Sequence, residues 1–406
     1  MFTRRQTLAS GAGAALLGGC AASVPRDGDA MEPEYRTVPG QARLLVGADG
    51  TRTAEVSGRH EGRPFTPDSP FRVASVSKVL VGELARRLHA DGQLDLDADA
   101  ADLLDVPLRH PDHPDAPVTL RRLVSHRSGI IDPAVYWMAA PGDIRDLLID
   151  TIWEPGVRPG AGFRYANLNY GLAATVMEAA TGERFDRLFT RHVADPLGLD
   201  IGFNWSGVSP AKRRSGFPAL RGIPAAWAVQ VDGADTLAGA QPAILREDGW
   251  DLRDYVPGTN GTLFSPQGGL RASVNDLAVI GQEVILAQPE LWTQLWIAAQ
   301  TGGRGSESEV VAGRGSEEGH FVAFGDALYI YPDGPLPGET DAAWVGHHGE
   351  AYGVYCGLWA VPARGEVFVH ADLGSPPDGS PLLGGTPNQT ALATEAFAWA
   401  SRRIAG

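Results

Sequence analysis

The order of strand-like and helix-like segments along the chain constrains its fold more than any other feature. Two short strand-like runs, residues 42–46 and 51–56, flank an Asp-Gly turn near the start, and strand patterns return only after residue 320. Between them, apolar residues recur with the spacing of amphipathic helices. Strands from both ends of a chain can pair in one sheet, with the helices packed against it. We therefore predict an α+β fold with an antiparallel sheet built from both chain ends, flanking helices, and a helix-rich insertion over about residues 90–260.

The remaining elements follow from periodicity and from turn residues. The late strands are predicted at residues 321–331, 351–361 and 367–371, with a hairpin turn at 362–365. The stretch 202–261 is dense in Gly, Pro and Arg, which predicts loops. Helices are predicted at residues 75–89, 120–125, 144–151, 168–180, 185–193 and 390–404.

Composition limits the classes of protein to which the chain can belong. Its 406 residues are 43% hydrophobic, which is enough for a large buried core. The formal net charge of −15 argues against nucleic-acid binding, because phosphates need basic partners. No run of 18 strongly apolar residues is present, so we predict no transmembrane helix. With two cysteines and no H-E-x-x-H motif, the sequence predicts no metal and no cofactor, and Cys356, in an apolar run, is predicted to be a buried free thiol.

Residues 1–19 have the pattern of an export signal. An Arg4-Arg5 pair precedes an uncharged stretch rich in Ala, Gly and Leu, and the pair resembles a twin-arginine signal. The segment ends in Leu17-Gly18-Gly19-Cys20, which resembles a lipoprotein signal in which Cys20 is lipidated; a plain secretory signal is the alternative. We therefore predict an exported protein of the periplasm or cell envelope. A lipid on Cys20 would make it a membrane-tethered, outer-membrane lipoprotein, with residues 20–40 as the tether and 41–406 as the folded domain.

Ser75 and Lys78 are the first candidates for chemistry. They stand one turn apart at the start of a predicted helix, which places their side chains on one face with Cβ atoms about 5–6 Å apart. A neutral lysine amine can take the proton of a serine hydroxyl, whereas an arginine cannot lose its proton. Of the 34 basic residues only Lys78 and Lys212 are lysine. The alternative, a surface charge at Lys78, fits poorly with the apolar residues around it.

Tyr165 and Asn167 form the second candidate group, just before the helix predicted from residue 168. A tyrosine hydroxyl near cations can relay a proton, and an asparagine amide can donate to a substrate carbonyl and accept from a lysine. The alternative is purely structural, because Asn is a common helix cap and a Gly-rich turn precedes this segment.

The third group is Gly346-His347-His348-Gly349 at the start of a late strand. Gly349 would let a substrate lie along the strand edge, the backbone N–H of Glu350 could point at an oxyanion, and His347 could offer a hydrogen-bond donor or a charge. The alternatives are a metal-binding histidine pair or exposed histidines. Adjacent strand residues face opposite sides, which argues against chelation by both histidines.

In this order, Ser75-x-x-Lys78, Tyr165-x-Asn167 and His347-x-Gly349 resemble the β-lactamase and penicillin-binding-protein superfamily of serine hydrolases. The most similar branch contains class C β-lactamases, D-alanyl-D-alanine carboxypeptidases, D-aminopeptidases and esterases. Two more segments agree: residues 123–129 resemble the family's LLTHTSG, and residues 268–278 resemble its GGLxST…DLA. The likeness covers about residues 40 to 400.

The resemblance implies a β-lactamase/transpeptidase-like fold and acyl transfer. Ser75 would attack a carbonyl, with Lys78 and Tyr165 sharing the proton transfers and Asn167 aligning Lys78 and substrate. The N–H groups of Ser75 and Glu350 would form the oxyanion hole. The expected substrate is a small-molecule or short-peptide ester or amide.

Two departures from the family pattern bear on the substrate. His347 stands in place of the lysine typical of true β-lactamases, which implies weaker or pH-dependent binding of a substrate carboxylate. His348 replaces a small hydroxyl residue, which also argues against antibiotic recognition. We therefore rank an esterase or D-peptide hydrolase above a β-lactamase.

Two further alternatives come from other classes. A Ser-His-Asp hydrolase would need a nucleophile elbow, and the nearest match, residues 207–211 around Ser209, lacks the second glycine. A non-catalytic envelope lipoprotein could keep the fold as a binding scaffold, although Ser75, Lys78 and Tyr165 are all present.

Overall fold

The computed structural model describes most of the chain between residues 40 and 404. The predicted export signal, Cys20 and the tether up to residue 39 lie outside the described residues. In the part that is described, no helix is long and apolar enough to cross a membrane. The described ranges are 40–60, 62–138, 142–203, 205–217, 219–221, 226–228, 255–289, 296–297, 323–331, 334–335, 342–351, 354–374 and 391–404.

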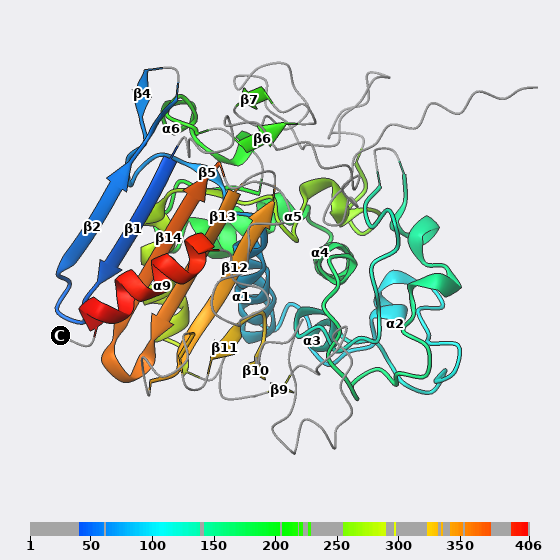
Figure 1. Ribbon diagram of the computed structural model, residues 1–406. Helices are drawn as coiled ribbons and strands as arrows, with labels where there is room; N and C mark the ends of the chain where they lie inside the picture. Colours follow the sequence, from blue (N-terminus) through cyan, green and yellow to red (C-terminus); the bar gives the residue numbers. More distant parts are fainter. Residues whose placement is uncertain are drawn as a thin grey trace, which may run out of the picture.

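An eight-stranded antiparallel sheet forms one side of the molecule (Figure 1). Its strand order is β2-β1-β14-β13-β12-β11-β10-β9, so the first two strands of the chain join the last strands through the β1–β14 pair. This confirms the predicted sheet from both chain ends. The strands are β1 (Gly40–Val46), β2 (Arg52–Ser57), β9 (Trp296–Ile297), β10 (Ala323–Phe324), β11 (Tyr329–Tyr331), β12 (Trp344–Ala351), β13 (Val354–Val361) and β14 (Glu366–Leu373).

Three strand predictions differ in detail from the structure. The run 321–331 contains two short strands, β10 and β11, because the chain turns between them with Ala327 at φ 62°. Residue 351 ends β12 rather than beginning the next strand. The histidine segment therefore lies inside β12 and not at its start. The hairpin turn over residues 362–365 is confirmed, since Pro362–Arg364 form a 3-10 turn between β13 and β14.

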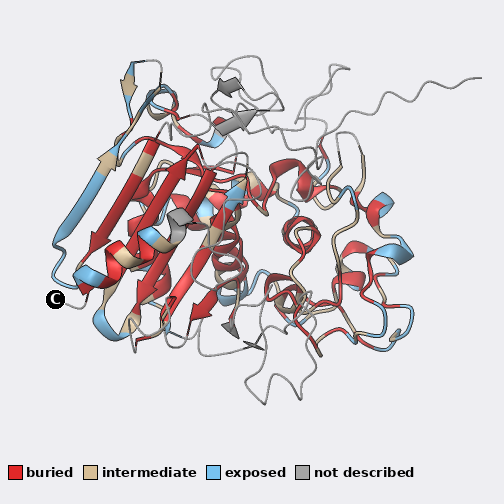
Figure 2. Ribbon diagram, in the orientation of Figure 1, coloured by how far each residue is buried: buried red, intermediate tan, exposed pale blue. Residues whose placement is uncertain are grey.

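Helices pack against each face of the sheet, and strands β1, β12, β13 and β14 are mostly buried, whereas the edge strand β2 is exposed (Figure 2). Strand alternation separates the two layers of side chains. On one face, Trp359 and Phe368 pack against Phe397 of α9 (Ala391–Ile404), which crosses the sheet in Figure 1. On the other face, Leu358 and Val367 join the main core with α1 (Ser77–Ala90) and α7 (Val274–Ile280).

The remaining helices lie mostly beside the sheet, to the right in Figure 1. The predicted helix over residues 144–151 is wrong, because this stretch forms two 3-10 turns, Ile144–Leu147 and Asp150–Ile152. The predicted helix over 185–193 continues as a π-type turn, Thr190–Ala194. The α-helices are α2 (Ala100–Leu104), α3 (Leu120–Val124), α4 (Leu168–Thr181), α5 (Phe185–Phe189) and α6 (Pro210–Arg213).

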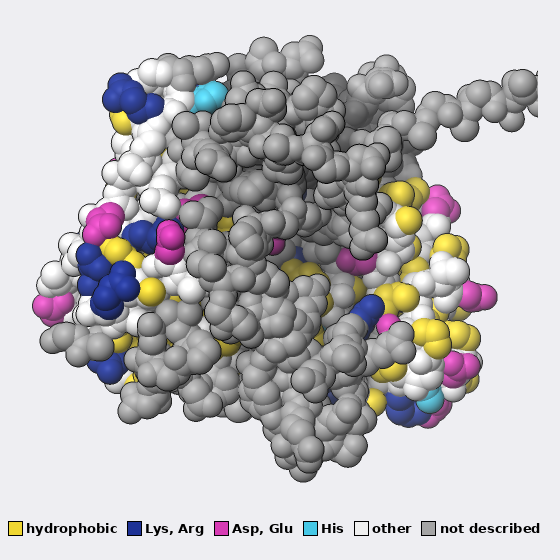
Figure 3. Space-filling view, in the orientation of Figure 1, with side chains coloured by type: hydrophobic (Ala, Val, Ile, Leu, Met, Phe, Trp, Pro, Cys, Tyr) yellow, Lys and Arg dark blue, Asp and Glu magenta, His cyan; other side chains and the backbone are white. Residues whose placement is uncertain are grey.

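On the described part of the face shown in Figure 3, acidic and basic side chains are interspersed. One visible region is α9, where Arg403 pairs with Glu55 of β2 at 2.8 Å and lies over the Trp399 ring. Surface pairs of this kind contribute little to stability.

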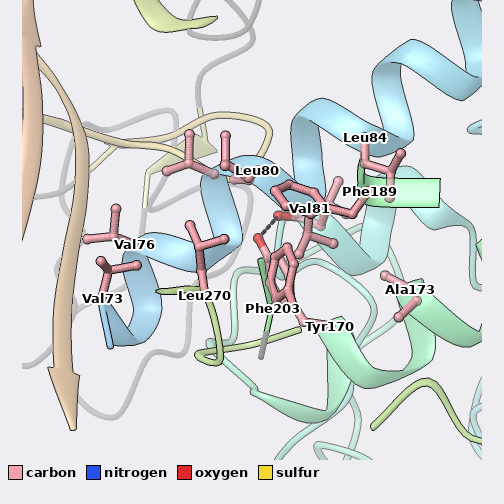
Figure 4. Close-up of a cluster of buried hydrophobic side chains, with 14 of the residues drawn as sticks. Val73, Val76, Leu80, Val81, Leu84, Tyr170, Ala173, Phe189, Phe203 and Leu270 are labelled. Carbon is pink, nitrogen blue, oxygen red and sulfur yellow. Dashed lines mark hydrogen bonds between the residues drawn. The ribbon is translucent and has the colours of Figure 1, made fainter. Parts of the chain in front are cut away.

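The start of α1 lies inside the main hydrophobic core (Figure 4). The short strand β5 (Phe71–Arg72) pairs with β8 (Arg271–Ala272), and the chain then enters a 3-10 turn, η2 (Ala74–Val76), that leads into α1. Ala74 holds a left-handed φ of 45°, which is uncommon for a residue other than glycine. Val76 and Leu80 are each 1% exposed, as their helical spacing predicts. A tight turn anchored on both sides therefore precedes the helix.

Candidate active site

Ser75 lies in η2. From residue 69 to residue 85 it is the only residue that is partly exposed, and all the others are buried. Ser77, two residues later, is buried and donates to the carbonyl of Ala74 at 2.5 Å. Ser77 Oγ also accepts from the N–H of Leu270 at 3.0 Å. These bonds tie the turn to the 268–278 segment and leave Ser75 as the reachable hydroxyl.

Lys78 is completely buried, and its Nζ contacts three oxygen atoms. Asn167 Oδ1 lies at 3.0 Å and the carbonyl of Gln267 at 2.8 Å, and both of these atoms can only accept. The third partner, Ser75 Oγ at 3.0 Å, can donate or accept. In a neutral amine the two N–H bonds would serve the two acceptors, so the lone pair would point at the Ser75 hydroxyl. The arrangement is therefore suited to proton transfer from serine to lysine.

Tyr165 completes the surroundings of the serine. Its hydroxyl donates to Ser75 Oγ at 3.0 Å, and the Lys78 Nζ lies 4.8 Å from the centre of its ring. Ser75 Oγ thus has an amine and a phenol, each 3.0 Å away. The structure brings together Ser75, Lys78, Tyr165 and Asn167 as the sequence predicts, although 90 residues separate the serine from the tyrosine.

The purely structural alternative for Asn167 is wrong. Asn167 does stand at the N-terminus of α4, but its side chain makes no capping hydrogen bond. It reaches Lys78 instead.

His126 supports Tyr165 from behind, a role that sequence reasoning missed. Its carbonyl accepts from the N–H of Arg164 at 2.7 Å, and its Nδ1 accepts from the N–H of Ala166 at 3.1 Å. Its ring lies 4.3 Å from the Tyr165 ring, centre to centre. His126 belongs to the LLTHTSG-like segment, which was the one available signal. Burial lowers the pKa of His126 well below its usual range, so the ring stays neutral and keeps its acceptor.

The structure differs from the expectation for His347. The side chain is 1% exposed, its Nδ1–H donates to the carbonyl of His348 at 2.5 Å, and its buried Nε2 has no hydrogen-bond partner. Burial, with a smaller effect of the Lys78 charge, lowers the pKa of His347 to about 3. His347 therefore offers neither a spare donor nor a positive charge at neutral pH. Of the two expected consequences, weaker or pH-dependent binding of a substrate carboxylate, a neutral buried ring favours the weaker binding.

His348 faces the opposite side of the sheet. It contacts Tyr331 at 2.6 Å and Tyr355 at 3.0 Å, and its ring packs on Trp359 beneath α9. The expectation that two adjacent histidines face opposite ways is confirmed. His348 therefore packs in the layer beneath α9 and places no small hydroxyl group beside Ser75.

Gly349 brings β12 against the turn that carries Ser75. A Cβ atom at this position would lie 2.3 Å from the carbonyl oxygen of Val73 and 2.8 Å from the Sγ of Cys356. Cys356 is buried and free, as predicted, and donates to the same carbonyl. Glu350, the next residue, has an exposed side chain. Only glycine lets the strand approach η2 this closely.

The described residues contain no group of three or more His, Cys, Asp or Glu that could hold a metal ion. The potential ligands nearest to Ser75 already have structural partners: His126 binds the N–H of Ala166, and His347 binds the His348 carbonyl.

The pKa of His347 predicts how stability changes with pH. Between its usual value of 6.5 and about 3, the unfolded chain binds a proton at His347 that the folded chain does not. The free energy of unfolding contributed by this group is thus complete above pH 6.5 and falls as the pH falls. In urea unfolding between pH 7.5 and 4.5, the free energy of unfolding should fall more steeply for wild type than for His347→Gln. The difference in slope should be about 1.4 kcal/mol per pH unit in the acid part of the range. Parallel curves for the two proteins would show that His347 titrates normally in the folded state.

Comparison with known proteins identifies relatives of several activities. A model of the Beta-lactamase family matches residues 29–371. Penicillin-binding protein 4 of Amycolatopsis lactamdurans is 31% identical over 176 residues, which cover 42% of this chain and 46% of that protein. Esterase EstB of Burkholderia gladioli is 31% identical over 194 residues, which cover 43% of this chain and 47% of that protein. The matched segments span about half the length of these curated relatives.

Solved structures agree on the fold. A class C beta lactamase from Rhodobacter sphaeroides superposes with a TM-score of 0.61 at 17% identity, covering 91% of this chain and 95% of that one. A D-stereospecific amidohydrolase from Streptomyces sp. superposes with a TM-score of 0.53 at 20% identity, covering 82% and 89%. At these identities the similarity concerns the fold alone, and it confirms the predicted β-lactamase/transpeptidase-like architecture.

Proposed function

The chain belongs to the Beta-lactamase family, and from this premise we propose that it is a serine hydrolase that cleaves an ester or amide through an acyl-enzyme on Ser75. One observation carries the proposal. Ser75 Oγ lies 3.0 Å from both the Lys78 Nζ and the Tyr165 hydroxyl, at the one reachable position in a buried turn.

In the first half of the reaction, Ser75 Oγ attacks the substrate carbonyl carbon while its proton passes to the Lys78–Tyr165 pair. The N–H groups of Ser75 and Glu350 receive the negative charge on the carbonyl oxygen. The same pair then returns the proton to the leaving alcohol or amine, and the bond between it and the acyl carbon breaks. In the second half, a water molecule attacks the acyl-enzyme, gives up a proton to the pair, and restores the Ser75 hydroxyl as the acid leaves.

The substrate class follows from the charges around the serine. A β-lactam antibiotic carries a carboxylate, which a cation beside the serine would bind. At this position the chain has His347, which is neutral and buried. Lys78 is committed to three oxygen atoms. The site therefore favours small-molecule or short-peptide esters and amides that need no carboxylate recognition, which ranks esterase or D-peptide hydrolase activity above β-lactamase activity.

Labelling with a fluorescent fluorophosphonate tests the nucleophile. Wild-type protein should be labelled, and Ser75→Ala should abolish both labelling and turnover. The matched control is Ser209→Ala, in the segment that comes nearest to a nucleophile elbow; Ser209 caps α6 by accepting from the N–H of Lys212 and should be dispensable for turnover. Labelling that survives Ser75→Ala would point to another nucleophile, and no labelling of wild type would favour the non-catalytic scaffold.

A parallel screen identifies the substrate class. p-Nitrophenyl esters, D-amino-acid amides and nitrocefin should be tested on the same preparation. We expect ester or amide hydrolysis to exceed nitrocefin hydrolysis in kcat/KM by at least about tenfold, since each 1.4 kcal/mol of lost binding is a factor of ten. Nitrocefin as the best of the three substrates would assign the protein to the β-lactamases instead.

The place of action remains part of the proposal. The Arg4-Arg5 pair and the segment ending in Cys20 support export to the periplasm or cell envelope, with a lipid on Cys20 as the membrane tether. Mass spectrometry of the mature N-terminus from cells that express the full chain tests both points.

A further inference from the structure

Helix α4 begins without a cap from its own sequence. Its first residues, Asn167 and Leu168, present backbone N–H groups that have no partner within the helix. The side chain of Asn167 does not fill this role. Both N–H groups instead donate to Asp132, a residue 35 positions earlier: that of Asn167 to Oδ2 at 2.9 Å and that of Leu168 to Oδ1 at 2.8 Å. A distant carboxylate thus caps the helix, and the Asn167 side chain is released for another task.

The same carboxylate determines which way the Asn167 amide points. Asn167 Nδ2 donates to Asp132 Oδ2 at 3.0 Å, and Asn167 Oδ1 accepts from the Lys78 Nζ at 3.0 Å. The reversed amide would place an oxygen against the carboxylate and an N–H₂ group against the lysine. Both contacts would then be repulsive, because a carboxylate only accepts, and the Lys78 Nζ presents an N–H bond to Asn167 whether it is protonated or is neutral with its lone pair at Ser75. Asp132 therefore excludes the reversed orientation.

We propose that Asp132 is a positioning residue that fixes the Asn167 amide, and through it the Lys78 amine, for proton transfer from Ser75. The inference rests on the proposed function. Asp132 itself is not in hydrogen-bond contact with Ser75 or with Lys78; it acts through Asn167. Burial raises the pKa of the Asp132 carboxyl group, while its hydrogen bonds from Leu168 and Asn167 and the charge of Lys78, within electrostatic range, act in the opposite direction.

Other titratable groups surround the lysine. Tyr165 and Tyr170 place their rings 4.8 and 5.2 Å from its Nζ, and the neutral His126 and His347 lie within electrostatic range. Asp132 adds an acidic side chain to this set of neighbours. Its removal should therefore disfavour the protonated amine.

The test is Asp132→Asn. The Asp132 carboxylate accepts three hydrogen bonds, whereas an asparagine has one oxygen, and its N–H₂ group would face a donor. We therefore expect the Asn167 side-chain amide to rotate away from its present orientation. We expect kcat for a p-nitrophenyl ester to fall about tenfold to a hundredfold with KM nearly unchanged, as for a small misplacement of a reacting group. The acid limb of the pH profile of kcat should move to lower pH. The matched control is Asp99→Asn, which removes the carboxylate that caps α2 and should lower stability without either kinetic effect.

A second variant guards against misfolding of Asp132→Asn. Asp132→Ser removes the charge and both carboxylate oxygens and leaves a shorter side chain with a single hydroxyl. Because it places no N–H₂ group against the N–H groups of α4, it should fold even if Asp132→Asn does not, and it should show the same loss of kcat. In a double-mutant cycle, Asp132→Ser should cost little more once Asn167→Ala is present, because both act through the same contact.

The outcomes distinguish this inference from the proposed function. If wild type has no Ser75-dependent hydrolysis, the proposed function fails first. If wild type is active, then a folded Asp132→Ser with wild-type kcat and an unmoved acid limb overturns the positioning role. Additive losses of kcat in the cycle with Asn167→Ala would also overturn it, since they would show that Asp132 acts independently of Asn167.

Discussion

Lys78→Arg should abolish hydrolysis almost as completely as Lys78→Ala, with kcat/KM reduced by on the order of 10³-fold or more in both. Arginine keeps the positive charge, but it cannot lose its proton at any pH at which the protein is folded. Lys78 is also completely buried among Ser75, Asn167 and Gln267, so a larger planar group cannot occupy the same volume. Steady-state kinetics with a p-nitrophenyl ester measures the loss, and circular dichroism verifies that each variant is folded.

The chain provides its own control, because it contains only one other lysine. Lys212 lies on α6 and pairs with Asp276 at 2.6 Å, in a contact that an arginine can also make. Lys212→Arg should therefore keep activity within about twofold of wild type, because the ion pair with Asp276 is retained. Activity of Lys78→Arg within about tenfold of wild type would contradict a role for Lys78 as the base.

The chemistry-bearing motifs could be predicted from the sequence because each contains its own local signal. Ser75 and Lys78 are one helical turn apart, and Tyr165 and Asn167 precede a clear apolar helix. The sheet could likewise be predicted, because strand patterns stand at both chain ends. The structure shows that these motifs come together in one site, for example at the 3.0 Å contact between Ser75 Oγ and the Tyr165 hydroxyl.

Asp132 and the ionisation of His347 could not be predicted, for two different physical reasons. Asp132 acts on a helix that begins 36 residues later, and no periodicity in the chain connects a loop carboxylate with a helix start that it will cap. His347 is a recognisable motif residue, but its charge depends on burial, which only the assembled sheet determines. The sequence identifies the histidine, but the residues that bury it in the folded protein determine whether it carries a charge.

The position of His348 illustrates a third limit. In a strand, a shift by one residue moves a side chain to the other face. The sequence indicates that His347 and His348 point opposite ways, but not which one faces the helix that carries Ser75. The packing of Trp359 and Phe397 against His348 beneath α9 settles the choice.

Gly349→Ala should have the second large effect, because it inserts a methyl group where β12 contacts the turn of Ser75. The added Cβ would lie 2.3 Å from the carbonyl oxygen of Val73 and 3.2 Å from Cγ2 of Val76. Both residues flank the turn, and the Val73 carbonyl accepts from the Val76 N–H at 3.2 Å, so neither atom can move alone. The strand must therefore retreat, which separates the two N–H groups that we propose bind the oxyanion.

We expect Gly349→Ala to lower kcat by about 10²- to 10³-fold, as for the loss of one oxyanion donor, and to lower stability by about 1–3 kcal/mol. Cys356→Ala is the matched control, because it removes the Sγ that lies 2.8 Å from the same position without adding volume; it should leave kcat nearly unchanged. The double variant should remain as slow as Gly349→Ala, because the nearest obstacle is backbone and not sulfur. Recovery of kcat in the double variant would show that the sulfur, and not the turn, limits the approach of the strand. A folded Gly349→Ala enzyme with wild-type kcat would place the oxyanion donors elsewhere.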